Sequence, residues 1–326
     1  MVITRTPFRI SFFGGGTDYP AWYRNNKGSV ISTTIDKYCY ISCRYLPPFF
    51  EHKHRVVYSL IENVKEISEI KHPAVRAVLE YMKIEEGLEI HHDGDLPART
   101  GLGSSSSFTV GLLNALYALK GVMISKEKLA KEAIYIEQEV LKENVGSQDQ
   151  VAVAFGGLNK ITFYPDDSFT VEPVILPPDR KEELQSHLLL YFTGFSRIAS
   201  EVAAEQIKSI EKNKYELRIM QQMVDEAANI LSGGKDLKEF GKLLDEAWKI
   251  KRTLTSKITN EYIDNIYEKA KKLGVIGGKL LGAGGGGFML FFAPPELHHK
   301  IKQEISGLFV PFKFENQGSQ VIVYYL

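Results

Sequence analysis

The sequence has few cysteines, and both of them fall in one short stretch. Cys39 and Cys43 are the only two among 326 residues. They lie within residues 30–45, which are rich in Ile, Tyr, Val and Thr and therefore predict a strand. Four residues along a strand span about 13 Å, too far for a disulfide between the two. We expect two free thiols in a reducing compartment.

The chain also lacks an excess of either charge and any long hydrophobic run. Lys and Arg together number 40, as do Asp and Glu, so no general basic surface is offered to a nucleic acid. No apolar run approaches the ~18 residues of a membrane helix, and the first residues show no signal-peptide pattern. These absences predict a cytoplasmic protein that binds neither nucleic acid nor membrane. The length is sufficient for two domains.

The most informative stretch that is present is PARTGLGSSSSF, residues 97–108. Gly101 and Gly103 let the backbone approach a ligand closely, and the apolar residues that follow repeat at helical spacing. The serines from Ser104 to Ser107 therefore stand at a helix start, where free N–H groups and the helix dipole favour phosphate. A serine that only caps the helix is the alternative, but the order of glycines, serines and helix favours a phosphate site. No Lys-Ser or Lys-Thr follows the glycines, which excludes a Walker loop.

Two further segments are rich in glycine. Residues 14–20, GGGTDYP, follow a strand predicted over Val2–Phe13. They fit either a hairpin turn or a ligand-binding loop, and spacing alone leaves both open. Residues 282–287, GAGGGG, match the dinucleotide pattern G-x-G-x-x-G. That pattern requires a helix after the glycines, whereas Phe288–Phe292 predicts a strand, so a Rossmann site is excluded.

Two regions supply candidate carboxylates. A helix predicted over residues 125–143 carries Glu137 and Glu139 in its C-terminal half. A negative charge there is unfavourable unless a cation compensates for it, and a solvated glutamate is the alternative. Asp149 lies between two glutamines in a polar, glycine-bearing segment. From the residues alone this segment is either a surface turn or a loop that holds a catalytic carboxylate.

The remaining chain mixes strands and helices. Residues 62–82 are expected to be partly helical, with a helix start at Pro73, and residues 200–273 to form at least three helical pieces. A helix over residues 296–306 and two short strands are expected to close the chain. The proline-rich break at residues 177–179 is a candidate domain boundary.

The three glycine-bearing segments, in this order, resemble the GHMP kinase superfamily, named for galactokinase, homoserine kinase, mevalonate kinase and phosphomevalonate kinase. Residues 9–19 resemble its first motif, residues 97–106 its second, P-x-x-x-G-L-G-S-S, and residues 279–288 its third. The resemblance implies an α+β fold of two domains with the active site between them. Residues 1–180 would form a ribosomal-S5 domain 2-like domain with the phosphate loop, and residues 181–326 a ferredoxin-like domain with the third motif.

Details of the motifs resemble a bacterial branch that phosphorylates D-glycero-D-manno-heptose 7-phosphate at its anomeric hydroxyl. These details are GGGTD at residues 14–18, IDKY at 35–38, GSQDQ at 146–150 and TGFSR at 193–197. Fucose kinase domains share parts of the pattern. The resemblance thus implies an ATP-dependent sugar kinase. A fucose- or mannose-type sugar 1-kinase is the first alternative, and a sensor that binds sugar and nucleotide without catalysis is the second.

The resemblance also implies roles for single residues in phosphoryl transfer. Asp149 would be the base for the sugar hydroxyl, and Arg9 would activate that hydroxyl or stabilise the transferring charge. Ser104 and Glu137 would hold Mg²⁺, which prefers oxygen ligands, with Glu139 as the alternative to Glu137. The ATP phosphates would be bound by Gly101, Leu102, Gly103, Ser104, Ser105, Ser106 and Ser107.

The expected ligand of the remaining site is a small sugar phosphate. The resemblance places its sugar against Gly15, Gly16, Thr17, Asp18, Gly284 and Gly285. We expect Arg197 to bind its phosphate, because Arg197 follows a predicted strand and precedes a helix start. A solvated Arg197 paired with Glu201 or Glu205 is the alternative, and Lys37 and Arg44 are weaker candidates. The sequence carries no signal for the oligomeric state.

Overall fold

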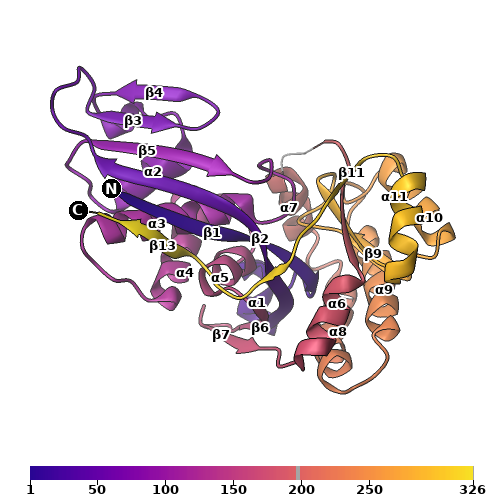
Figure 1. Ribbon diagram of the computed structural model, residues 1–326. Helices are drawn as coiled ribbons and strands as arrows, with labels where there is room; N and C mark the ends of the chain where they lie inside the picture. Colours follow the sequence, from indigo (N-terminus) through magenta and orange to yellow (C-terminus); the bar gives the residue numbers. More distant parts are fainter. Residues whose placement is uncertain (196–198, 326) are drawn as a thin grey trace.

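The computed structural model describes residues 1–195 and 199–325 and places them around two sheets. In Figure 1 the indigo and magenta strands of the larger sheet lie on one side, and the orange and yellow helices of the second half lie on the other. The larger sheet has nine strands with the central order β13-β1-β2-β5-β3-β4, while β6 and β12 pair with β2, and β7 pairs with β6. Its strands are β1 (Val2–Phe13), β2 (Gly28–Tyr45), β3 (His54–Val57), β4 (Ile61–Val64), β5 (Leu88–Gly94), β6 (Leu158–Phe163), β7 (Phe169–Pro173), β12 (Phe314–Glu315) and β13 (Gln320–Tyr324).

Strand β1 is the predicted N-terminal strand, with the predicted bounds, and it positions the site. It pairs antiparallel with β2 along its whole length, and its register shifts after Pro7. Proline has no N–H to give to a ladder, so an irregularity there is expected. The strand ends where the glycines of residues 14–16 begin. It therefore carries Arg9 into the centre of the molecule and delivers the glycine loop beside it. Both cysteines on β2 are buried and free, as predicted.

The helices of the first half cover this sheet. Helix α3 (Ser104–Leu119) packs on β1 and β2 and begins at the predicted residue. Pro73 starts α2 as predicted, but the helical expectation from residue 62 is wrong there, because residues 61–64 form the edge strand β4. The helix predicted over residues 125–143 is shorter and ends in a π-helical turn. The helices and turns are α1 (Pro20–Asn26), η1 (Ile67–Glu69), α2 (Pro73–Tyr81), α4 (Lys126–Tyr135), the π-turn η2 (Ile136–Val140) and α5 (Gln148–Phe155).

The second half forms a four-stranded antiparallel sheet of order β11-β8-β10-β9 with its own helices. Strand β10 directly follows the glycines and is fully buried, which confirms that no Rossmann helix is present at that point. No helix in the described part of the chain combines the length and apolar content that crossing a membrane requires. The elements are α6 (Pro178–Ser186), β8 (Leu188–Phe192), α7 (Ala199–Lys208), α8 (Lys214–Ser232), α9 (Lys238–Thr253), α10 (Glu261–Lys272), β9 (Gly277–Leu280), β10 (Phe288–Phe292), η3 (Pro295–Leu297), α11 (His298–Glu304) and β11 (Leu308–Val310).

The C-terminal residues return to the first sheet. Strand β12 pairs with β2, β13 pairs with β1, and Figure 1 shows the two chain ends together at the same edge. Three strands therefore close the chain, not two, and the last two of them lie outside the second sheet. The division at residue 180 stays a prediction. By strand pairing, residues 314–324 belong to the first sheet.

A pair of glycines tests how much this returning segment contributes to stability. Gly156 has φ +74°, and a Cβ there would lie 2.1 Å from the Gln317 carbonyl carbon. Gly121 has φ +71° with no atom within 4 Å of its Cβ position. Both Gly→Ala changes place a side chain at positive φ. Gly156 has ψ 165°, a region that essentially only glycine adopts, so its alanine variant carries a larger backbone cost and also an overpacking cost of about 1–3 kcal/mol. Denaturant unfolding should therefore show Gly156→Ala as the less stable variant. Equal losses would mean that residues 316–318 move aside at little cost.

Candidate active site

Three consecutive side chains at the start of α5 contact three different groups. Gln148 Nε2 donates to Asp18 Oδ2 at 2.9 Å, Asp149 accepts from Arg9, and Gln150 Nε2 donates to Glu137 Oε2 at 2.5 Å. Successive helical residues are rotated by about 100°, so neighbours in sequence reach different sides. The interpretation of this segment as a surface turn is wrong, because the Gln148 and Gln150 side chains are buried.

Asp149 is held by a two-point contact with Arg9. The Arg9 Nε and Nη2 atoms donate to the two carboxylate oxygens at 2.7 and 2.6 Å, and Nη1 donates to the Gly101 carbonyl at 2.6 Å. A planar guanidinium can make these three bonds at once, whereas a lysine ammonium has no such fork. Arg9 is buried, while the Asp149 side chain keeps 24% of its surface exposed. The carboxylate is thus fixed in direction and still open to a ligand.

The helix start of α3 lies directly against this ion pair. Gly103 caps the helix with φ +77°, and a Cβ there would lie 3.2 Å from Arg9 Cγ and 3.4 Å from Asp149 Oδ2. The hydroxyls of the four serines that follow have different surroundings. Ser104 Oγ accepts from the Arg99 N–H, Ser107 Oγ donates to the Pro7 carbonyl, Ser106 Oγ donates to Glu137, and Ser105 is exposed. The free N–H groups of the first turn and the Asp149 carboxylate therefore face a common region.

Glu137 is fully buried beside this helix start. The π-turn η2 closes through the Leu141 N–H and the Ile136 carbonyl, five residues apart, and such turns are frequent at functional sites. Glu137 Oε2 accepts from Ser106 at 2.9 Å, while Oε1 has no hydrogen-bond partner among the described residues. Burial raises the pKa of Glu137 to about 7. Among the described residues no Lys or Arg forms an ion pair with Glu137, so this buried carboxylate has the chemistry of a cation ligand.

The structure distinguishes Glu137 from Glu139 as the carboxylate near the serines, and it shows which serine contacts Glu137. Glu139 is exposed and pairs with Lys142 at 2.9 Å, so it does not join the serines. The hydroxyl that contacts Glu137 belongs to Ser106, not to the predicted Ser104. Helical spacing could not distinguish these serines, because the rotation of α3 against η2 decides which one faces the carboxylate.

The first glycine segment is a loop that encloses Asp18. Asp18 Oδ1 accepts from the Gly16 N–H at 2.8 Å, and a Cβ on Gly146 would lie 1.8 Å from Oδ2, so only glycine fits there. Burial raises the pKa of Asp18, and the nearby charge of Asp149 adds to this. Thr17, a predicted sugar contact, is fully buried, and its hydroxyl donates to the Gly14 and Ser29 carbonyls. The structure thus gives Thr17 the role of holding the loop.

The second and third motifs touch through their glycines. A Cβ on Gly282 would lie 2.5 Å from the Gly101 Cα, and the Phe288 N–H donates to the Thr100 carbonyl at 3.0 Å. Gly284 and Gly285 pack on Ile258, whose carbonyl accepts from the Gly285 N–H at 2.8 Å, and their contact with the sugar stays a prediction. The third motif therefore supports the loop before α3 from the side of the second sheet.

Two buried lysines lie behind these loops, and no pattern in the sequence indicated that they would be buried there. Lys251 Nζ donates to the Leu280 and Gly282 carbonyls at 3.1 and 2.6 Å, and Lys279 Nζ donates to the Phe12 carbonyl at 2.9 Å. Over residues 1–195 and 199–325 neither lysine has a carboxylate within ion-pair distance. Burial lowers the pKa of Lys251 to about 7 and that of Lys279 well below its usual value. Lys251 lies in a helix whose many Lys and Glu residues suggested only a solvated face.

The three basic residues that we considered as partners of a substrate phosphate lie in different parts of the chain. Arg197 lies outside the described residues. Lys37 pairs with Asp36 at 3.2 Å. Arg44 bonds Glu89 at 2.7 Å and lies on β2 ten residues beyond Thr34, the partner of Arg9, which is about 33 Å along the strand. Arg44 is therefore excluded from the site.

Two models of known protein families match this chain, one in its first half and one in its second half. The model of the GHMP kinases N terminal domain matches residues 68–157, and that of the GHMP kinases C terminal domain matches residues 223–310. Across 100% of both chains the fold is similar to the crystal structure of a D-glycero-D-manno-heptose 1-phosphate kinase from Bacteroides thetaiotaomicron, with a TM-score of 0.82 at 22% identity. This likeness confirms the predicted two-domain α+β fold.

Two curated relatives cover nearly the whole chain. A D-glycero-alpha-D-manno-heptose 7-phosphate kinase of Campylobacter jejuni is 28% identical over 97% of both chains. A galactokinase of Pyrococcus furiosus is 30% identical over 88% of this chain and 87% of its own. The chain therefore belongs to the GHMP kinase family and is a phosphotransferase with an alcohol group as acceptor.

Proposed function

We propose that this kinase transfers the γ-phosphoryl group of ATP to the anomeric hydroxyl of a sugar, and that the sugar is D-glycero-D-manno-heptose 7-phosphate. The observation that carries the proposal is the position of Asp149. Its carboxylate is fixed by Arg9, lies beside the helix start of α3, and is linked through Gln148 to the buried Asp18. A base, a phosphate site and a sugar-binding carboxylate thus meet at one place. The Campylobacter relative is named for the same substrate.

In this proposal the residues of α3 and its preceding loop bind ATP. The N–H groups of the first helical turn, with Gly101, Leu102 and Gly103 before them, face the nucleotide phosphates. Phosphoryl transfer depends on positioning and charge neutralisation more than on covalent chemistry. The Arg9 bond to the Gly101 carbonyl couples the position of this loop to that of the base.

The residues around Glu137 fit Mg²⁺. Glu137 offers a buried carboxylate oxygen without a hydrogen-bond partner among the described residues, and Ser106 offers a hydroxyl beside it. Both are oxygen ligands of the kind that Mg²⁺ takes while it keeps several waters. Bound there, the ion would neutralise charge on the nucleotide phosphates. Ser104, at the first position of the same helix, remains the second hydroxyl that we predict for the ion.

At the sugar, Asp149 takes the proton from the attacking hydroxyl and Arg9 holds the carboxylate in line. Asp18, together with the loop of Gly15 and Gly16, binds sugar hydroxyls, since carboxylates accept from hydroxyl pairs. Arg197 stays our predicted partner of the substrate phosphate. A cytoplasmic location also stays a prediction.

An assay of ADP release separates the proposal from its alternatives. The purified protein is given MgATP with heptose 7-phosphate, unphosphorylated heptose, D-mannose, L-fucose or mevalonate, and the product is located by ³¹P NMR. We expect the highest kcat/KM with heptose 7-phosphate and a phosphate at C1. Preference for an unphosphorylated sugar would favour a fucose- or mannose-type kinase. Binding of sugar and ATP without turnover would favour the sensor.

Asp149→Asn tests the base. The variant should fold normally and keep its KM for ATP, because the amide retains most of the side-chain volume and the helix start is unchanged. Its kcat should fall by about 10²- to 10⁴-fold, the usual contribution of a positioned base. Asp167→Asn is the matched control, since Asp167 forms an exposed ion pair with Arg24 at 2.8 Å. Turnover of Asp149→Asn close to the wild-type value would remove Asp149 from this role.

Glu137→Gln tests the buried carboxylate through stability. The pKa of Glu137 is about 7 in the folded protein and near 4.5 in the unfolded chain. Between these values the folded state binds the extra proton, so its stability falls as the pH rises from 4.5 to 7 and stays lower above 7. In EDTA at pH 8, Glu137→Gln should therefore be more stable than the wild type by on the order of 1–3 kcal/mol, and at pH 4.5 the two should agree.

The control for this prediction is Glu139→Gln, two residues along the chain and exposed. Its stability should stay within about 0.5 kcal/mol of the wild type at both pH values. Added MgCl₂ at pH 8 should raise the melting temperature of the wild type and of Glu139→Gln, but not of Glu137→Gln. Superimposable pH–stability curves for Glu137→Gln and the wild type would contradict the assignment.

A further inference from the structure

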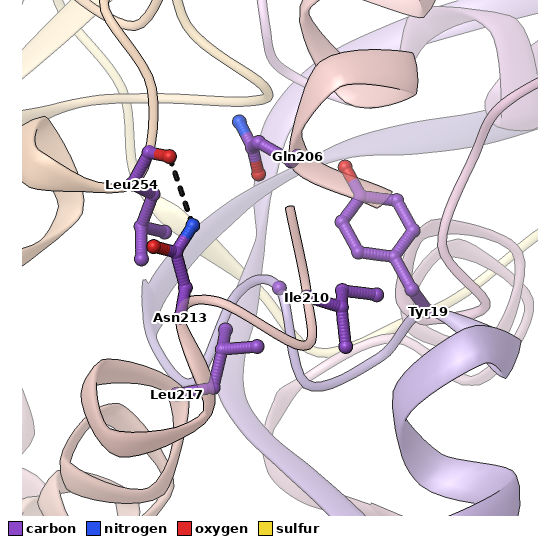
Figure 2. A pocket seen from close by; sticks show the side chains of 7 residues that line it. Tyr19, Gln206, Ile210, Asn213, Leu217 and Leu254 are labelled. Atoms are coloured by element: carbon purple, nitrogen blue, oxygen red, sulfur yellow. Dashed lines mark hydrogen bonds between the residues drawn. The ribbon is translucent and has the colours of Figure 1, made fainter. Parts of the chain in front are cut away.

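A small pocket lies between the Asp18 loop and the helices of the second half. Figure 2 shows its lining side chains: Tyr19, Gln206, Ile210, Asn213, Leu217 and Leu254. Gly16 of the first motif completes the lining. The space is about 10 Å³, which is room for one water molecule or one hydroxyl oxygen.

We propose that this pocket receives one uncharged hydroxyl group of the sugar, and that Tyr19 and Gln206 determine which sugar is accepted. The inference rests on the proposed sugar kinase function and goes beyond it by assigning the specificity site. It follows from the position of the pocket, from the two polar groups in its wall, and from the absence of a cation in its lining.

The pocket adjoins the residues expected at the sugar. The Gly16 N–H donates to Asp18 Oδ1, and Tyr19 directly follows Asp18 in the chain. The charges of Asp18, Asp149 and Arg9 all act on the Tyr19 hydroxyl, so it lies within electrostatic reach of the reacting groups. A sugar bound to Asp18 with its anomeric hydroxyl at Asp149 would therefore have a further hydroxyl beside this pocket.

Two groups in the wall form a donor and an acceptor for one hydroxyl. Gln206 Nε2 donates to the Ala283 carbonyl at 2.7 Å, which fixes the amide and leaves Oε1 as an acceptor. The Tyr19 hydroxyl makes no hydrogen bond within the described residues, and in Figure 2 it lies on the same side of the pocket as the Gln206 amide. Burial, followed by the charges of Asp18 and Asp149, raises the pKa of Tyr19, so its hydroxyl stays a donor.

The remaining wall is apolar or already hydrogen-bonded. Ile210, Leu217 and Leu254 are buried, and Asn213 Nδ2 donates to the Leu254 carbonyl at 2.9 Å. No Lys or Arg belongs to the lining. A phosphate placed here would lose its hydration without gaining a cation. The pocket is thus suited to a neutral hydroxyl group, and the phosphate of the substrate must lie elsewhere.

Tyr19→Phe and Gln206→Met test the proposal with three probes: heptose 7-phosphate, D-mannose and L-fucose. Tyr19→Phe keeps the buried ring and removes only the hydroxyl. We expect kcat/KM for the preferred sugar to fall by about 2- to 12-fold, the loss of one neutral hydrogen bond, and the ratio to the less preferred sugars to fall with it. Gln206→Met should act in the same direction. The KM for ATP should not change in either variant.

Tyr45→Phe is the control, because Tyr45 is an exposed tyrosine at the far end of β2. It should leave all kinetic constants unchanged. Equal losses for all three sugars in Tyr19→Phe, or an unchanged preference in both variants with melting temperatures near the wild-type value, would overturn the specificity assignment while the kinase stands. A wild-type protein that uses none of the three sugars would overturn the sugar kinase proposal and, with it, this inference.

Discussion

The active site depends on the rotation of one helical turn. Gln148, Asp149 and Gln150 contact Asp18, Arg9 and Glu137, groups that come from the glycine loop, from β1 and from the π-turn. Because three consecutive residues supply all three contacts, these groups cannot be adjusted independently. A small rotation of α5 would shift them together. The two uncharged glutamines therefore fix the positions of Asp18 and Glu137, two of the residues that we propose to act in the site.

Much of the fold and the position of the site follow from the sequence because they are encoded locally. The apolar pattern of Val2–Phe13, the helix start at Ser104 and the strand after the third glycine segment are each visible within a few residues. The resemblance of the three motifs then identifies the family. What the sequence does not reveal depends on how elements pack. The contact of Glu137 with Ser106, the burial of Thr17 and the π-turn at Glu137 are set by contacts between segments distant in the chain.

The buried lysines show why charge counts mislead at such a site. Lys251 looks like one of many surface cations, yet it donates to two carbonyls and has no carboxylate partner in the described part of the chain. An uncharged amine has two N–H groups, which matches two carbonyl partners. The lowered pKa is consistent with this form near neutral pH. As hydrogen-bond donors, Lys251 joins α9 to the third motif, and Lys279 joins the third motif to the end of β1, across the two sheets.

The return of the C-terminal strand to β1 also orders the events of synthesis. During translation β1 leaves the ribosome long before its neighbour β13 (Gln320–Tyr324). Until then the outer edge of β1 has unpaired N–H and C=O groups, and such an edge can pair with another chain. This edge of the nascent chain is therefore exposed to other nascent chains on the same messenger RNA until residues 320–324 have been added. A truncated product that ends before residue 320 would never gain that protection.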